Sequence, residues 1–128
     1  KCIIILMNLV VFLLIIGLLL FNIKLSRRGA MFYWFFELSH FLMGFLIASL
    51  TYLTFSTNNI TVILCVIASS VLWEFWEYVA IKFLWLNNFI KKLFNYHIDK
   101  QTFNDTLLDL ILDLSGAIFF IVLQSIFA

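Results

Sequence analysis

Long apolar runs dominate the chain and predict its main elements. Four of them are long enough to cross a bilayer as helices, which takes about 20 residues. They cover approximately residues 2–23, 30–55, 60–86 and 104–128. The runs are too continuous for the alternating pattern of membrane β-strands. The pattern therefore predicts an all-α membrane fold, a four-transmembrane-helix bundle, with residues 1–128 forming a single integral membrane domain.

The connection between the third and fourth runs has a helical pattern of its own. Apolar residues recur at helical spacing on one side and lysines lie on the other: Phe89, Ile90, Leu93 and Phe94 against Lys91 and Lys92. Such a segment predicts a short interfacial helix on the inner leaflet. Asn104 is predicted to be the N-cap of the helix that follows.

Composition agrees with a membrane location and narrows the partners. Hydrophobic residues make up 65% of the chain and charged residues 12%, whereas soluble domains are on average less than half apolar. A net charge of +1 without a basic stripe predicts no nucleic-acid partner. Cys2 and Cys65 form no CxxC pair and are interpreted as small apolar residues of helices. The first run is too long for a signal-peptide core, so we expect a retained helix.

Basic residues predict the orientation in the membrane. They gather after the first run and before the fourth: Lys24, Arg27, Arg28, Lys91, Lys92 and Lys100. Residues 56–59, between the second and third runs, carry no charge. With four spans, the two basic connections lie on one side. The positive-inside rule places that side in the cytoplasm and both termini outside, in the cytoplasmic membrane of a bacterium or archaeon.

Acidic residues are distributed in the opposite way. Six of the seven lie within or at the edge of a predicted span: Glu37, Glu74, Glu77, Asp105, Asp109 and Asp113. Carboxylates are costly in a bilayer and usually face a bundle interior or cavity. Glu37 and His40 are three residues apart, as are Glu74 and Glu77, and the aspartates are four apart. Each set therefore shares one helix face.

The depth of these groups also agrees. From the side that carries the basic connections, a rise of 1.5 Å per residue puts His40 at about 15 Å and Glu77 at about 13 Å. Asp109 and Asp113 follow at about 7 and 13 Å. The spacing and depth predict one buried polar site between the second, third and fourth spans.

Several carboxylates that face one another cannot all be ionised without compensation. Protons, the His40 imidazole, water or a divalent metal ion can supply this compensation. For a metal ion the candidate ligands are His40, Glu74, Glu77, Asp109 and Asp113. Oxygen ligands suit magnesium or manganese, and a histidine admits zinc or iron. If the protein is an enzyme, the candidate catalytic residues are Glu74, Glu77 and Asp109.

Structural roles compete with this hypothesis. Asp105 can simply favour the positive end of its helix dipole. Glu37 can pair with the arginines at 27 and 28 near the interface. His40 can be an interhelical hydrogen-bonding residue. Trp73 is interpreted as a packing residue, and Gly44 and the 115–117 segment as surfaces for close helix contact.

Three phrases occur in a familiar order: HFLMGFLIA at 40–48, VLWEFWEYV at 71–79 and DTLLDLILDLSGA at 105–117. Together they resemble the YjdF-like inner-membrane proteins of bacteria and archaea and, more distantly, the VanZ-like superfamily. VanZ-like proteins tend to have a glutamine at the position of Glu77 and an asparagine near Asp113. The resemblance covers roughly residues 37–117 and implies a polytopic membrane protein. Some VanZ-like members are linked to glycopeptide-antibiotic resistance, which implies cell-envelope lipids.

Three functions remain open. The first is a metal-dependent site that acts on a membrane lipid or a lipid-linked headgroup. The second is a proton- or cation-coupled carrier, which with four spans requires an oligomer. The third is a structural or assembly protein without catalysis. The expected partners are membrane lipid and either a second copy or another membrane protein.

Overall fold

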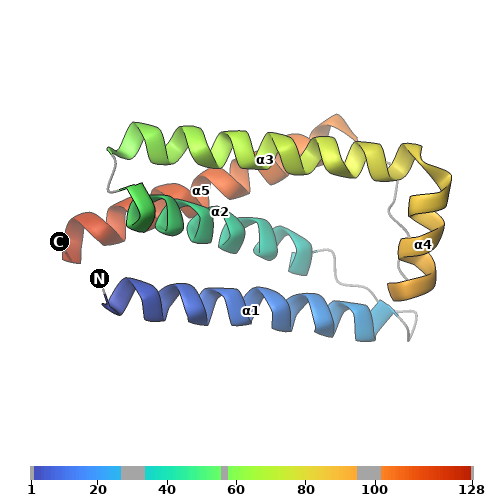
Figure 1. Ribbon diagram of the computed structural model, residues 1–128, viewed down its shortest axis with the longest axis horizontal. Coiled ribbons are helices and arrows are strands. Elements are labelled where there is room, and N and C mark those ends of the chain that lie inside the picture. Colours follow the sequence, from blue (N-terminus) through green and yellow to red (C-terminus); the bar gives the residue numbers. More distant parts are fainter. Residues whose placement is uncertain (1, 27–33, 56–57, 95–101, 128) are drawn as a thin grey trace.

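The computed structural model describes residues 2–26, 34–55, 58–94 and 102–127, and these residues are nearly all helical (Figure 1). The helices are α1 (Cys2–Ser26), α2 (Trp34–Phe55), α3 (Asn59–Lys82), α4 (Leu84–Phe94) and α5 (Phe103–Phe127). The described ranges contain no strand. Four helices, α1, α2, α3 and α5, are long and apolar enough to span a membrane. The predicted all-α fold with four spans is confirmed.

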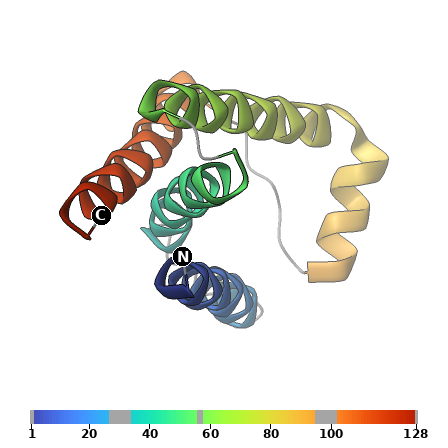
Figure 2. The same ribbon diagram turned by 60° about the vertical axis from the view of Figure 1, so that its left-hand side comes forward.

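Helix α2 lies at the centre of the bundle, with α1 on one side and α3 and α5 on the other (Figure 2). The most extensive packing joins α2 to α5, which run parallel. A cluster of buried residues from α2, α3 and α5 forms the core: Phe45, Ala48, Val62, Val66, Ala117 and Phe120. Helix α1 adds a narrow seam, in which Asn8 accepts a hydrogen bond from Ser49 of α2.

Two glycines allow α2 and α5 to approach closely. A Cβ atom added to Gly44 would lie 1.9 Å from the backbone oxygen of Asp113. A Cβ atom added to Gly116 would lie 1.9 Å from the backbone oxygen of Phe41. Only glycine fits such contacts, which small residues provide in membrane helix pairs. The predicted close contact at these glycines is therefore confirmed.

The third span is shorter than predicted. Helix α3 ends at Lys82, because Phe83 has extended backbone angles (φ −92°, ψ 98°). The chain then turns, and α4 runs across the end of the bundle (Figure 1). Residues 84–86, predicted to belong to the span, form the first turn of α4. The apolar run continues through the turn, so hydrophobicity alone does not reveal it. The predicted short helix between the third and fourth spans is present as α4.

The start of α5 corrects one prediction. Thr102, not Asn104, caps this helix, which begins at Phe103. The backbone N–H of Asp105 donates to Thr102 Oγ1 at 3.3 Å, and the N–H of Thr102 donates to Asp105 Oδ2 at 3.2 Å. This reciprocal pair is a capping box, which satisfies two otherwise unpaired donors. It gives Asp105 a local structural role at the helix terminus.

Candidate functional site

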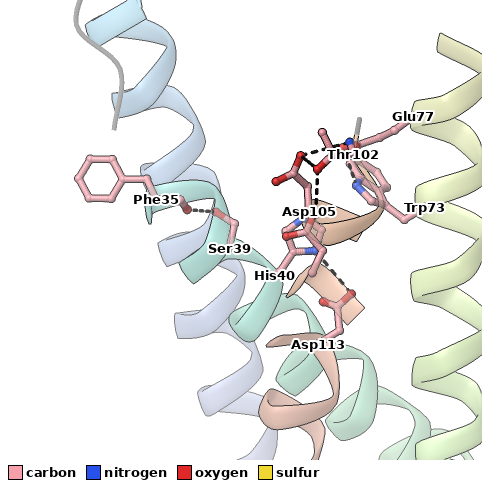
Figure 3. A network of polar contacts seen from close by, with 9 residues as sticks. Phe35, Ser39, His40, Trp73, Glu77, Thr102, Asp105 and Asp113 are labelled. Atoms are coloured by element: carbon pink, nitrogen blue, oxygen red, sulfur yellow. Dashed lines mark hydrogen bonds and ion pairs between the residues drawn. The ribbon is translucent and has the colours of Figure 1, made fainter. Parts of the chain in front are cut away.

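The site begins with His40, whose ring lies between two aspartates of α5. His40 precedes Gly44 by one turn of α2, so the close helix contact brings its ring against α5. Its Nδ1 atom lies 3.5 Å from Asp113 Oδ2 (Figure 3), and its Nε2 atom lies 3.7 Å from Asp109 Oδ2. Since the aspartates are four residues apart on one face, they hold opposite edges of one imidazole.

A third helix contributes Glu74 from α3. Its side chain is buried, with 9% of the residue exposed. One ligand atom from each of His40, Glu74 and Asp109 lies within 4.8 Å of the others. Thr106, three residues before Asp109 on α5, lies near the Glu74 carboxyl group. Thr106 was not predicted to belong to the site, although its spacing of three from Asp109 places it on the acidic face of α5.

Asp113 is the most buried acid of the group, with 4% of the residue exposed. One carboxyl oxygen faces His40, whereas Oδ1 has no hydrogen-bond partner in the described part of the chain. An unpaired oxygen at this depth is unfavourable unless a proton or a cation compensates it. Asp113 therefore contacts the cluster through His40 and is not one of the three residues whose ligand atoms converge.

Glu77 is placed differently from the other predicted ligands. Its Oε1 atom accepts a hydrogen bond from the indole Nε1–H of Trp73 at 3.0 Å, and the residue is only partly buried. Figure 3 shows the two side chains together on α3. Three residues of helix rotate Glu77 away from the direction of Glu74 by about 60°. Glu77 is thus outside the three-residue group, and Trp73, predicted to be a packing residue, is also a hydrogen-bond donor.

Two further acids lie at the rim of the bundle. Glu37 is exposed near the start of α2, and its predicted partners at 27 and 28 lie outside the described residues. Asp105 belongs to the capping box at the start of α5 (Figure 3). The acids of the spans therefore divide into a buried group between three helices and an outer group at the helix ends.

The cluster occupies one half of the bundle. We call the half that contains the starts of α2 and α5 and the end of α3 the α4 half, and the opposite half the far half. Gly44 and Gly116 lie at the boundary between them. Beyond these glycines the core is mainly apolar, with Phe45 and Phe120 in an edge-to-face contact at a centroid distance of 5.5 Å, and it also buries Ser49 and Thr51.

Four membrane-length helices around a half-buried histidine and several carboxylates define a polytopic helical membrane protein with an internal polar site. A family model described as "Predicted membrane protein (DUF2238)" matches residues 1–128. The chain belongs to this family, which is that of the YjdF-like proteins. The more distant resemblance to VanZ-like proteins stays a prediction. Searches of curated proteins and of solved structures gave no match.

Proposed function

We propose that the protein binds a divalent metal ion between α2, α3 and α5 and uses it on the phosphate-bearing headgroup of a membrane lipid or lipid-linked carrier. The observation that carries this proposal is the convergence of His40, Glu74 and Asp109, whose ligand atoms lie within 4.8 Å of one another. Nitrogen and oxygen ligands bind such ions at about 2.0–2.2 Å. Two ligands of one ion are therefore at most about 4.4 Å apart, so small side-chain shifts complete the site.

The two edges of the His40 ring support different roles. We assign Nε2 as the metal ligand, because it faces Asp109 at 3.7 Å. Nδ1 faces Asp113 at 3.5 Å, and a proton on Nδ1 donated to that carboxylate would fix the ring orientation. Asp113 is then a positioning residue, in contrast to its predicted role as a ligand.

The ligand set suits a metal that tolerates nitrogen and oxygen together. One imidazole and two carboxylates favour zinc, manganese or iron, whereas magnesium prefers oxygen and water. Three protein ligands leave coordination positions for water and a phosphate oxygen. Glu77 is near enough to the group to influence His40 electrostatically, and we propose it as an outer acid on the approach to the site.

The position of the cluster supports a lipid substrate. It lies in the α4 half, one to three turns from the start of α5, where a headgroup of the adjacent leaflet can reach it. The far half contains the hydrophobic core and offers no comparable cluster of charged groups to a headgroup in the described residues. A phosphate at the site would place its negative oxygens on the ion, and the ion would polarise a bound water.

Metal uptake is the first test. The protein in lipid nanodiscs should bind about one zinc or manganese ion per chain, measured by calorimetric titration and elemental analysis. Asp109→Asn should abolish this uptake because it removes an anionic ligand. Glu37→Gln is the matched control, since it removes an exposed acid from α2 one turn from His40. No bound ion in the parent protein, or equal uptake by the Asp109 variant, would refute the proposal.

Lipid chemistry is the second test. Nanodiscs containing phosphatidylglycerol, with or without a polyprenyl phosphate, should show a metal-dependent change of one of these lipids by mass spectrometry. The change should disappear in Asp109→Asn and persist in Glu37→Gln. If the protein bound one metal ion per chain but changed neither lipid, the metal site would be supported and the proposed lipid reaction would be refuted.

A proton-coupled carrier is the second candidate, and one observation favours it. An imidazolium at His40 contacts both Asp109 and Asp113, at 3.7 and 3.5 Å, and compensates one of these two negative charges without a metal, so that the second carboxyl group carries a proton. Intramembrane carboxylates with histidine are typical of proton relays. Proteoliposomes should then show proton flux that Asp113→Asn abolishes. Flux that is absent, or unchanged in this variant, would exclude the carrier.

A further inference from the structure

Helix α4 is held to the bundle on one side only. It follows the turn at Phe83, whose carbonyl accepts hydrogen bonds from the N–H groups of Leu86 and Asn87 at 2.9 and 3.1 Å. Both ribbon views show α4 directed away from the axis of α3 and across the bundle end (Figures 1 and 2). Among the described elements, its substantial packing is with α3. Within the described part of the chain, the remaining surface of α4 makes no comparable packing contact.

The open surface of α4 carries aromatic and basic side chains next to each other. Trp85 and Phe89 are one turn apart and are 69% and 55% exposed. Lys91 and Lys92 lie in the last turn and are both exposed. Lys92 follows Phe89 by three residues on the same face, whereas Lys91 lies on the opposite side of the helix. Asn87 is turned toward the bundle and is buried. The helix contains no acidic residue, so its exposed surface combines large aromatic side chains with uncompensated positive charge.

We propose that α4 is a docking surface for anionic phospholipids of the leaflet that it faces. Trp85 and Phe89 enter the boundary between headgroups and acyl chains, where aromatic side chains are favoured. The long side chains of Lys91 and Lys92 can then extend their ammonium groups to the phosphates. The charge of the pair is complementary to an anionic headgroup, and the proposal is independent of the metal site.

The same end of the molecule carries further positive groups that fit this partner. Lys24 lies in the last turn of α1 and Lys82 in the last turn of α3. The Lys82 ammonium group donates to Tyr78 Oη at 3.2 Å and lies 5.4 Å from the ring centroid. Lys82 is thus engaged within α3. Lys91 and Lys92 differ from it, because their own helix contains no acidic residue that could pair with them.

A local structural role for the lysines makes a different prediction. Positive side chains in the last turn of a helix stabilise its negative dipole end whatever the lipid. A lipid-binding role instead requires preference for anionic over zwitterionic headgroups. Each lysine near a bilayer surface strengthens association with anionic lipid about fivefold. Neutralising both should lower the preference on the order of 25-fold.

Quenching of Trp85 by brominated lipids separates these roles. The full chain is placed in nanodiscs that contain either brominated phosphatidylglycerol or brominated phosphatidylcholine at the same mole fraction. The part of the quenching that disappears in Trp85→Phe is assigned to α4. We expect stronger quenching by the brominated phosphatidylglycerol, and loss of this difference in Lys91→Gln/Lys92→Gln.

Two control variants complete the test. Lys91→Arg/Lys92→Arg keeps the charge and should keep the preference. Lys82→Gln removes one positive charge outside α4, from an ammonium group already engaged by Tyr78, and should lower the preference much less than the double glutamine variant. Equal quenching by both lipids, or a preference that survives the double glutamine variant, would overturn the proposal. Absence of Trp85 quenching by either lipid would place α4 away from the bilayer and would overturn it as well.

Discussion

The two halves of the bundle are built from the same helices and have opposite chemistry. In the α4 half, α2, α3 and α5 bring His40, Glu74 and Asp109 together. In the far half, they pack Phe45, Val66 and other apolar residues into a core. Gly44 and Gly116 stand between the halves and set how closely α2 approaches α5. One helix contact therefore determines both the packing of the core and the geometry of the site.

The two halves also differ in what their residues contribute: packing stability in the far half and charged groups in the α4 half. Lipid tails are as apolar as the far-half residues, so that half is stabilised by close packing and by a few hydrogen bonds. The α4 half places groups in the membrane that are unfavourable there unless they compensate one another. A change in one half should therefore affect a different measurement from a change in the other.

Replacing Gly116 with alanine should have the largest effect, because it alters both halves. The added Cβ would lie 1.9 Å from the Phe41 oxygen, so α2 and α5 must separate. We expect a loss of about 3 kcal/mol in unfolding free energy, as overpacking causes, together with loss of metal uptake. Denaturation in detergent, followed by circular dichroism, measures the first, and calorimetry the second.

Gly17→Ala is the matched control for this experiment. A Cβ at Gly17 of α1 meets no atom within 4 Å, so this variant should be at least as stable as the parent. If Gly116→Ala were as stable as the parent and kept its metal uptake, the contact between α2 and α5 would determine neither the stability of the core nor the geometry of the site.

Replacing Asp113 with asparagine should change the site without disturbing the far half. The variant weakens the interaction with His40 Nδ1, and loss of such an outer partner lowers metal affinity about 10- to 100-fold. Calorimetric titration with zinc measures the loss. Phe120→Ala, on the same helix in the far half, is the contrast: it should reduce stability by about 3 kcal/mol and keep the metal affinity. Equal affinities for the parent and Asp113→Asn would contradict the positioning role.

The smallest effect should come from Tyr52→Phe in the far half. This change removes the acceptor oxygen of a hydrogen bond from Gln124 Nε2, which has a length of 2.9 Å. Hydrogen bonds between membrane helices contribute about 0.6 kcal/mol on average, and unfolding in detergent should show a loss of that size. Metal affinity should stay the same. A fall in affinity would show that the two halves are more strongly coupled than the glycine boundary implies.

The arrangement of the site could be predicted in part from local spacing. Asp109 and Asp113 share a helix face because four residues make about one turn, and their contact with one imidazole follows that pattern. The same reasoning placed Glu77 beside Glu74. Helical spacing could not show which of the two glutamates joins His40 and Asp109, because both lie near the same face of α3. In the structure Glu74 does so, and Glu77 accepts a hydrogen bond from the Trp73 indole instead. Thr106 was not predicted, because its hydroxyl group carries no charge that would distinguish it within an apolar span.

By itself, the sequence determined the number of spans, which connections share a side of the bundle and the helix faces on which the acids lie. These properties follow from hydrophobic length and from the period of the helix, which are local. Tertiary structure decided where α3 ends, which acids meet His40 and how α4 is directed. Those outcomes depend on the approach of α2 to α5 at Gly44 and Gly116 and on the turn at Phe83. Such contacts join residues far apart in the chain, and no local pattern specifies them.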